Sequence, residues 1–241
     1  MNTEGDTALT SHSKQAVSRL LVVSDNPELT AWLQSEMARR SEATSPHVEY
    51  RYSAVNREPA AMIALGATAF NAKDPQAVAD VVAGFELVVS LHCKQIFPAD
   101  LVAGVVCVNV HPGLNPFNRG WYPQVFSLVN GLPIGATIHV MDAEVDNGEI
   151  IDQEGVEVLP SDTSLEVYTR VVAMEKLLIA RNLDRLLSLS FDTRRPMGVG
   201  NYNGISDYRS LCKLDLDHVA PLRAHLNVLR GLSHGEFRNA Y

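Results

Sequence analysis

Cysteine is scarce in this sequence of 241 residues, which has three, an odd number with no paired spacing. This scarcity excludes a disulfide framework as the basis of the fold, and a reducing compartment such as the cytoplasm is expected. Long hydrophobic runs are also absent, so no stretch reaches the length of a transmembrane helix and no membrane partner is expected. The N-terminal segment "MNTEGDTALTSHSKQ" lacks the apolar region of a signal peptide. We therefore expect residues 1–18 to form a disordered leader.

Positive charge is in short supply as well. Lysine and arginine number 20 against 28 aspartate and glutamate residues, which gives a formal net charge of -8. Binding to nucleic acid needs a basic face, so it is excluded as the main function, although a local pocket for a small anion stays possible. Hydrophobic residues make up 46% of the chain, enough for a globular core in one domain with a smaller addition.

Short apolar segments alternate with amphipathic ones in the first half of the chain. Strands are predicted at 19–26, 48–55, 86–93 and 104–111, with helices at 27–41 and 74–85. This alternation indicates an α/β fold with an open parallel sheet.

The pattern changes in the second half. A helix at 123–131, two strands at 134–142 and 148–158, and a long helix at 164–188 are predicted. From residue 189 the chain is rich in glycine, arginine, asparagine and tyrosine. We expect one catalytic domain over 19–188 and a small C-terminal subdomain over 189–241.

Polar side chains gather where the predicted strands end. Asn109 and His111 are two residues apart on one strand, so both side chains point to the same face. His139 lies on a later strand, and Asp146 lies in the loop that follows it. Since ligands of open α/β sheets bind outside the carboxyl ends of the strands, these groups are candidates for one site. The first strand ends in Ser24, Asp25 and Asn26, where a helix N-terminus can bind an anion.

An amide, an imidazole and a carboxylate together suit acyl transfer to an amine. Asn109 and a protonated His111 could donate hydrogen bonds to the tetrahedral oxyanion. Asp146 could orient His111, stabilise its charged form and take part in proton transfer. No nucleophilic serine or cysteine is required for this chemistry.

Each of these features also has a simpler explanation. A histidine before a proline at a strand end can be a packing or capping residue, and "VDNG" can be an ordinary turn. His139 fits a core histidine with a satisfied hydrogen bond, and the segment Ser24 to Asn26 fits a helix N-cap. The possible zinc ligands lack the spacing of a zinc site, so no metal is expected; they are Cys93, Cys107, His92 and His111.

In combination, "VNVHPGLNPFNRG" and "ATIHVMDAEVDNGEII" resemble the folate-dependent formyltransferase family, and the resemblance covers about residues 19–185. It implies a Rossmann-like domain (the formyltransferase fold), 10-formyltetrahydrofolate as the formyl donor, and Asn109, His111 and Asp146 as the catalytic set. It also implies that backbone groups of Cys93–Pro98 and Met141–Asp146 bind the pterin. The residues so assigned to the cofactor are Lys94, Gln95, Ile96, Phe97, Met141, Asp142, Glu144 and Asp146.

Three other segments are similar to the sugar N-formyltransferases, namely "GWYPQVFSLVNGLPIGATIH", "SLHCKQIFP" and "LRGLSHGEFRNAY". The resemblance implies a dTDP-linked 4-amino-4,6-dideoxyglucose, or a close relative such as the 3-amino isomer, as substrate. It also implies a homodimer with its contact in the C-terminal region.

A nucleotide-linked sugar would need groups for phosphate, sugar and base. Lys94, Arg119 and the start of the first helix could bind the phosphates. Trp121 and Tyr122 could line the sugar site, and Tyr202 could stack on thymine. Ordinary packing is the alternative for each of these aromatic residues.

Three alternatives to a sugar N-formyltransferase remain open at this point. Methionyl-tRNA formyltransferases carry a larger, basic C-terminal domain, whereas this chain is acidic and short after residue 190. Glycinamide ribonucleotide formyltransferases lack the "GWYP" segment. A non-catalytic protein that binds folate or a nucleotide sugar is the third, and a formyl-transfer assay would separate it from an enzyme.

Overall fold

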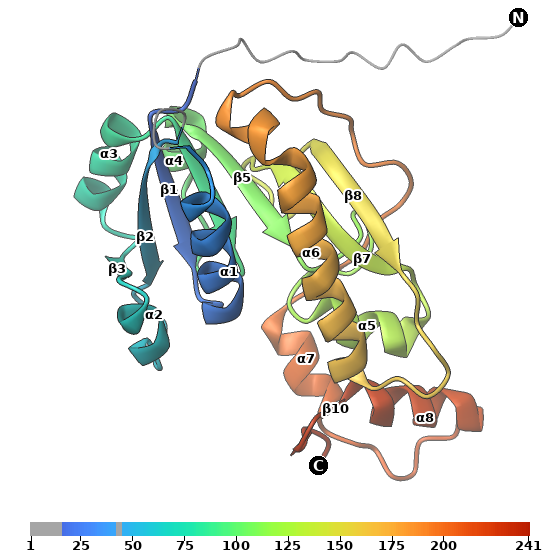
Figure 1. Cartoon of the computed structure of the whole chain (residues 1–241). Coiled ribbons are helices and arrows are strands. Elements are labelled where there is room, and N and C mark those ends of the chain that lie inside the picture. The colour runs from blue at the N-terminus through green and yellow to red at the C-terminus, as the bar shows by residue number, and fades with distance from the viewer. Residues whose placement is uncertain (1–15, 42–44) are drawn as a thin grey trace, which may run out of the picture.

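The computed structural model describes residues 16–41 and 45–241, and its centre is a seven-stranded sheet (Figure 1). In spatial order the strands are β3 (Thr68–Phe70), β2 (His47–Ser53), β1 (Arg19–Ser24), β4 (Leu87–Leu91), β5 (Val106–His111), β7 (Ile134–Val140) and β8 (Ile150–Val156). The first five of these are parallel to one another, whereas β7 pairs antiparallel with both β5 and β8. The open parallel sheet expected from the first half of the chain is therefore observed in these five strands, and β7 and β8 extend it in antiparallel pairs.

Helices cover both faces of the sheet (Figure 1). One face packs on α1 (Pro27–Ala38) and α6 (Ser164–Leu187), and the other on α3 (Pro75–Gly84) and α4 (Ala99–Gly104). Alternate residues of the strands are buried against each layer, because successive side chains of a strand point to opposite faces. Val22 belongs to the core beneath α1 and α6, and Val23 to the core beneath α3 and α4.

Local sequence explains where the helices begin. Asn26 caps α1 by accepting a hydrogen bond from the N–H of Leu29 at 3.0 Å, and Asp74 caps α3 in the same way. Each cap is followed by a proline, whose fixed φ and missing N–H suit the first helical position. The N-cap considered for the segment Ser24 to Asn26 is therefore present at Asn26.

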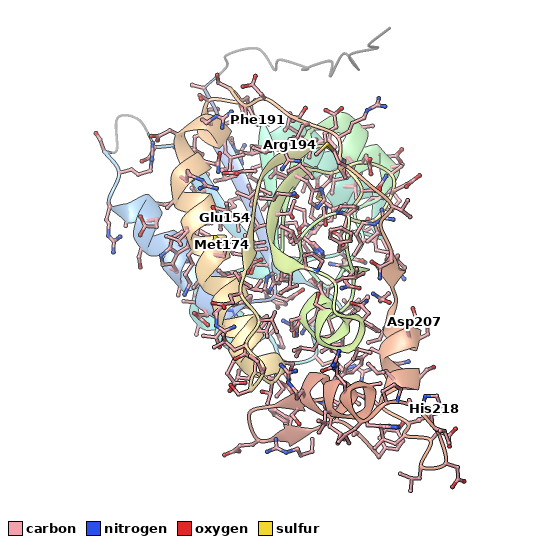
Figure 2. All side chains as sticks on the ribbon, turned by 90° about the vertical axis from the view of Figure 1, so that its right-hand side faces the viewer. Glu154, Met174, Phe191, Arg194, Asp207 and His218 are labelled. Carbon is pink, nitrogen blue, oxygen red and sulfur yellow. The ribbon has the colours of Figure 1, made fainter. Side chains whose placement is uncertain are left out.

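The C-terminal part lies beyond one end of the sheet and packs on α5 (Pro123–Asn130) (Figures 1 and 2). Figure 2 places Asp207 and His218 at the end of the molecule opposite to Phe191 and Arg194. The elements of the C-terminal part are β9 (Tyr202–Asn203), α7 (Ile205–Leu211), α8 (Leu222–Gly231), β10 (Ser233–His234) and β11 (Phe237–Arg238). Its small core of Val125, Cys212 and Leu232 joins it to α5.

The strand β9 makes a second connection to the main domain. It pairs in parallel with β6 (Arg119–Gly120), a two-residue strand just before α5. The expected open α/β sheet with a small C-terminal domain is therefore confirmed. The boundaries 19–188 and 189–241 remain predictions.

The expected leader at residues 1–18 lies only partly within the described residues. Most of the expected leader, residues 1–15, lies outside the described residues, whereas Val17 is buried and its N–H donates to the carbonyl of Leu187 at 2.8 Å. The short elements α2 (Ala60–Ala64), β3 and α4 are not anticipated by the apolar pattern. Within residues 16–41 and 45–241, no helix has the length and apolar character needed to cross a membrane.

Candidate active site

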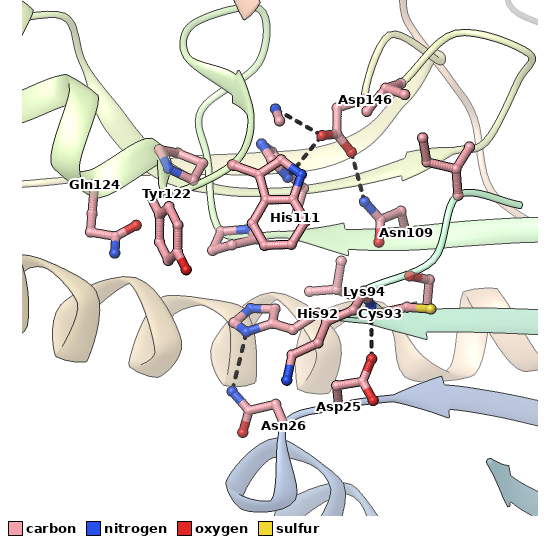
Figure 3. A pocket seen from close by; sticks show the side chains of 18 of the residues that line it. Asp25, Asn26, His92, Cys93, Lys94, Asn109, His111, Tyr122, Gln124 and Asp146 are labelled. Atoms are coloured by element: carbon pink, nitrogen blue, oxygen red, sulfur yellow. Dashed lines mark hydrogen bonds and ion pairs between the residues drawn. The ribbon is translucent and has the colours of Figure 1, made fainter. Parts of the chain in front are cut away.

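A pocket of about 790 Å³ opens at the carboxyl ends of β1, β4 and β5. The strand order reverses here, since β1 lies between β2 and β4, and such a reversal leaves a crevice in open α/β sheets. Figure 3 shows Asn109, His111 and Asp146 on one side of the pocket and Asp25, Asn26 and His92 on the other. The expected catalytic residues are therefore brought together.

Asp146 is the centre of the polar cluster. Its Oδ1 accepts from Asn109 Nδ2 at 2.9 Å, and its Oδ2 accepts from the Gly120 N–H at 3.0 Å. His111 Nδ1 lies 3.4 Å from Oδ2, and His139 Nε2 lies 3.5 Å from Oδ1. Its backbone is left-handed (φ 51°), a costly conformation that the surroundings must maintain, and Asn115 Nδ2 donates to its carbonyl at 2.9 Å.

His139 reaches the cluster because β7 runs antiparallel to β5. In this register His139 lies directly opposite Asn109, and residues so paired point to the same face. It is buried and its Nδ1 donates to the Val140 carbonyl at 3.0 Å, as expected for a core histidine. It also contacts Asp146, which the simpler explanation does not anticipate.

The site holds its carboxylate ionised and its central imidazole uncharged. Burial alone would raise the pKa of Asp146, but the neighbouring His111 and His139 and the Gly120 N–H outweigh it and hold that pKa well below its usual range. Burial lowers the pKa of His111 to about 4, despite the opposing effect of Asp146. His111 is therefore neutral near pH 7, and the expected protonated form is not that of the free site.

Asn109 and His111 also differ from simple oxyanion donors. One hydrogen of Asn109 Nδ2 points to Asp146, and the other faces His139 Nε2 at 3.3 Å. The Nε2 of His111 is buried without a hydrogen-bond partner among the described residues. A buried nitrogen without a partner costs free energy, which is typical of a position reserved for a reaction.

The depressed pKa of His111 predicts a measurable effect of pH on stability. Between about pH 7 and pH 5 the unfolded chain takes up a proton at this residue, because its pKa there is about 6.5, whereas the folded chain does not. The free energy of unfolding should therefore fall as the pH falls, by about 2 kcal/mol from this residue. His111→Asn should remove that part of the decline in urea unfolding at the two pH values. Equal declines in both proteins would contradict the assignment.

The expected pterin loop, 93–98, is anchored by side chains and exposes one of them. Gln95 binds backbone of the β3 region, with Oε1 accepting from the Ala72 N–H at 3.0 Å and Nε2 donating to the Phe70 carbonyl at 2.8 Å. Phe97 is buried against Phe70, whereas Ile96 is 73% exposed. Gln95 thus fixes the shape of the loop instead of pointing at a ligand.

The acidic loop, 141–146, is held in a similar way. Arg119 Nη1 donates to Asn147 Oδ1 at 2.6 Å and lies 3.5 Å from the Val145 carbonyl. Arg119 is not among the described residues that line the pocket, so its expected role in phosphate binding is not supported. The guanidinium instead holds the loop that carries Asp146.

The end of β1 also differs from the expected phosphate site. Ser24 is buried, does not line the pocket, and accepts from the Asn26 N–H at 3.1 Å. The carboxylate of Asp25 accepts hydrogen bonds from Ser53, Asn56 and the Lys94 N–H, the last at 2.7 Å. A carboxylate at this point opposes an anion, so Asp25 joins the loops after β1, β2 and β4 instead.

The other predicted residues line the pocket. They are Asn26, Lys94, Gln95, Ile96, Phe97, Trp121, Tyr122, Met141, Asp142, Glu144 and Tyr202. Trp121 and Tyr122 are each 37% exposed, and Tyr202 is 49% exposed. Part of each ring is therefore open to a ligand, while Tyr122 also packs on Tyr208, with the ring centroids 4.2 Å apart.

A third wall of the pocket is formed by residues that the sequence did not point to. It includes Tyr168 on α6 and three residues near the C-terminus, namely His234, Phe237 and Asn239. The spacing of Ser164, Tyr168 and Glu175 on one helix face could have suggested a polar stripe. Contact with a segment some 70 positions later could not have been read from that spacing.

Comparison with known proteins agrees with the geometry. A family model described as formyl transferase matches residues 6–183, and one described as an N-formyltransferase dimerization C-terminal domain matches residues 207–241. The chain belongs to the formyltransferase family. The expected resemblance is thereby confirmed over most of the chain.

Three relatives indicate to which group within the formyltransferase family the chain belongs. The chain is 44% identical over 164 residues to the dTDP-4-amino-4,6-dideoxyglucose formyltransferase of Mycobacterium tuberculosis strain H37Rv, covering 68% of this chain and 70% of that protein. A sugar N-formyltransferase from a Shewanella species is 50% identical with a TM-score of 0.90, over 92% and 91% of the two chains. A 4-N formyltransferase from Francisella tularensis is 37% identical with a TM-score of 0.84, over 93% and 91%. This formyltransferase is thus a sugar N-formyltransferase.

Proposed function

We propose that the enzyme transfers a formyl group from 10-formyltetrahydrofolate to the 4-amino group of dTDP-linked 4-amino-4,6-dideoxyglucose. The observation that carries the proposal is the cluster of Asn109, His111 and Asp146 in the pocket at the strand ends. Two of the relatives are named for formylation at the 4-amino or 4-N position, which favours this amine over its 3-amino isomer.

The pocket residues fit a proton relay for this reaction. The attacking amine forms a bond to the formyl carbon and loses a proton, while the donor nitrogen breaks its bond to that carbon and gains one. His111, uncharged in the free site, accepts the proton of the amine and returns it to the departing nitrogen. Asp146, ionised and 3.4 Å away, stabilises the imidazolium between these two steps.

The second part of the proposal is that Asn109 donates a hydrogen bond to the formyl oxyanion. Nδ2 keeps its hydrogen bond to Asp146, and its contact with His139, at 3.3 Å, is the longer and weaker of the two. That second hydrogen is the one available to the oxyanion. Asn109 is then held by the same carboxylate that assists His111.

The residues at 93–98 and 141–146 fit the flat, hydrogen-bonding ring of a pterin. Both segments line the pocket beside His111, and the side chains of Gln95 and Arg119 fix the two backbones. Ile96 offers an exposed apolar side chain to the ring. The formyl donor then occupies this side of the pocket, and the amino sugar enters from the opposite side.

A panel of nucleotide-linked amino sugars tests the substrate. The enzyme is incubated with 10-formyltetrahydrofolate and each dTDP-linked 4-amino or 3-amino sugar, and products are followed by mass spectrometry. We expect the largest kcat/KM with the 4-amino-4,6-dideoxyglucose compound. A higher value with the 3-amino isomer would reassign the amine, and an absence of product with all of them would reject the proposal.

Tyr202→Ala is expected to weaken binding of dTDP. Tyr202 lies on β9, half-exposed at the pocket, and a stacked base on an aromatic ring contributes about 1–3 kcal/mol, roughly ten- to a hundredfold in affinity. Calorimetric titration of dTDP measures the change, with titration of a folate analogue as the control. Unchanged affinity for dTDP would return Tyr202 to a packing role.

A homodimer through the C-terminal domain completes the proposal. The dimerization-domain model matches residues 207–241, and several apolar side chains of this segment are exposed, including Val219 at 94%, Leu222 at 72% and Leu226 at 49%. Burial of these side chains against a second copy would remove them from water. Sedimentation equilibrium should return the mass of two chains, and the mass of one would contradict it.

A further inference from the structure

A series of hydrogen bonds links Glu175, His92, Asn26 and Tyr168 in the pocket wall opposite Asp146. It begins at Glu175 on α6, which is fully buried, and whose two oxygens lie 2.8 and 3.0 Å from His92 Nε2. His92 follows β4 in a left-handed conformation with φ 52°, which is uncommon for a residue other than glycine. The proposed proton relay uses neither residue.

Asn26, the N-cap of α1, determines which atoms donate and which accept in this series of hydrogen bonds. Asn26 Oδ1 accepts from the Leu29 N–H, so its Nδ2 must face the pocket wall, where it lies 3.1 Å from His92 Nδ1. A carboxylate accepts from Nε2 and an amide donates to Nδ1, which puts the ring proton on Nε2 and the lone pair on Nδ1.

Tyr168 is the last member of this series and faces the pocket. Asn26 Nδ2 donates its other hydrogen to the Tyr168 hydroxyl at 3.0 Å, so that oxygen is already an acceptor. His92 Nδ1, at 3.4 Å, is a poor acceptor for the Tyr168 proton, because its single lone pair already receives Asn26. Burial raises the pKa of Tyr168 to about 12, so the hydroxyl keeps its proton. Tyr168 therefore presents a hydrogen-bond donor that has no good acceptor among the described residues.

The position of this donor indicates what it meets. Ser164, Tyr168 and Glu175 lie on one face of α6, and Tyr168 also contacts the ring of His234 from the C-terminal domain. Tyr168 and His234 belong to α6 and to the C-terminal domain, and not to the loops at 93–98 and 141–146, on which the formyl donor is proposed to bind. The ligand next to the Tyr168 hydroxyl is then the acceptor substrate, the nucleotide-linked amino sugar.

We infer that Tyr168 is a binding residue for the nucleotide-linked sugar, donating its hydroxyl hydrogen to an oxygen of the diphosphate or of the sugar, and that His92 and Glu175 are positioning residues that direct it. The inference rests on the proposed function for the identity of the ligand. Asn26 connects the two positioning residues to the hydroxyl through hydrogen bonds at 3.1 and 3.0 Å.

Tyr168→Phe tests the binding role, because it removes only the hydroxyl group and, with it, the hydrogen bond from Asn26. We expect the dissociation constant for dTDP-4-amino-4,6-dideoxyglucose to rise about three- to tenfold, the usual effect of one neutral hydrogen bond. A parallel titration with dTDP separates the two oxygen sources. An equal loss with dTDP identifies the diphosphate, whereas a loss confined to the amino-sugar compound identifies a sugar oxygen.

Tyr50→Phe is the matched control, since Tyr50 is a partly buried tyrosine on β2 that does not line the pocket. Unchanged affinity of Tyr168→Phe for the amino-sugar nucleotide would overturn the inference, as would a loss confined to the folate analogue. Because these are binding measurements, they stand even if the wild-type enzyme formylates none of the tested sugars, a result that would reject the proposed function by itself.

Glu175→Gln and Glu175→Ala test the positioning role. The amide oxygen of glutamine can still accept from His92 Nε2, so Glu175→Gln should keep the wild-type KM for the amino sugar. Glu175→Ala should raise that KM about as much as Tyr168→Phe, with kcat and the KM of the formyl donor retained, because uniform binding is lost. If the two Glu175 variants have equal KM values and both match the wild type, the positioning role is wrong.

Discussion

Turnover is expected to fall on the order of 10²–10³-fold when His111 is replaced by Asn, because the proposed relay then loses the group that moves the proton. Asp146→Asn should have a similar effect. It keeps the shape of the side chain but removes the ionised carboxylate that lies 3.4 Å from His111 Nδ1 and 3.5 Å from His139 Nε2. Single-turnover measurements with saturating substrates check the chemical step directly.

Folding and binding serve as controls for these two variants. His47→Asn changes a histidine whose side chain is 68% exposed on β2, outside the pocket lining, and it should retain turnover. Circular dichroism and titration with dTDP should show that His111→Asn and Asp146→Asn still fold and bind. Wild-type turnover in either variant, with chemistry limiting the rate, would contradict the assigned roles.

Gly113→Ala is expected to lower turnover on the order of 10²-fold, although the added methyl group takes no part in the reaction. A Cβ at this position would lie 2.4 Å from His111 Nε2 and 2.7 Å from its Cδ2. These distances are far below van der Waals contact, so the buried imidazole must move away from its place beside Asp146. A displacement near 1 Å is enough for an effect of this size.

Gly84→Ala is the matched control for this substitution. At Gly84, near the end of α3, the nearest atom to an added Cβ is Arg19 Nη1 at 4.0 Å. The loss should appear in kcat for Gly113→Ala and be absent for Gly84→Ala. If Gly113→Ala kept both kcat and the pH dependence of stability, His111 would not be confined as the structure indicates.

Most of the fold could be predicted from local sequence. Apolar runs of strand length, capped helices such as the one beginning after Asn26, and the long helix at 164–188 carry their own signals. The direction of β7 carries no such signal, because an isolated strand has the same pattern in parallel and antiparallel pairs. The short element α2 lacks the length over which helical periodicity is recognised.

Some residues of the candidate site could likewise be predicted from the sequence, and others could not. Asn109 and His111 could be paired from their spacing, since a strand places alternate side chains on one face. Asp146 is a candidate from its place in the loop after the strand of His139, and the resemblance to the formyltransferases implies its catalytic role. The roles of Asp25 and Arg119 could not be predicted, because charged side chains in sequence look available to a ligand until their protein partners are known.

The uncharged state of His111 is a property of the packed site. It depends on burial of the ring, which no local pattern records. For this reason the proposed role of His111 is that of a proton acceptor, and not that of an oxyanion donor. The wall formed by His92, Tyr168 and Glu175 likewise depends on contacts between β4 and α6, 83 positions apart for His92 and Glu175.

We propose that this pocket transfers a formyl group from a folate to the amine of a nucleotide-linked sugar, with His111 moving the proton. The most direct test of this proposal follows an isotope-labelled formyl carbon of 10-formyltetrahydrofolate by NMR, in the presence of dTDP-4-amino-4,6-dideoxyglucose and either the wild-type enzyme or His111→Asn. With the wild-type enzyme, we expect the label to appear in a formamide attached to the 4-position of the sugar. With the variant, the same signal should grow on the order of 10²–10³-fold more slowly. A label that stays on the folate with the wild-type enzyme, or that reaches the sugar equally fast with the variant, would contradict the proposal.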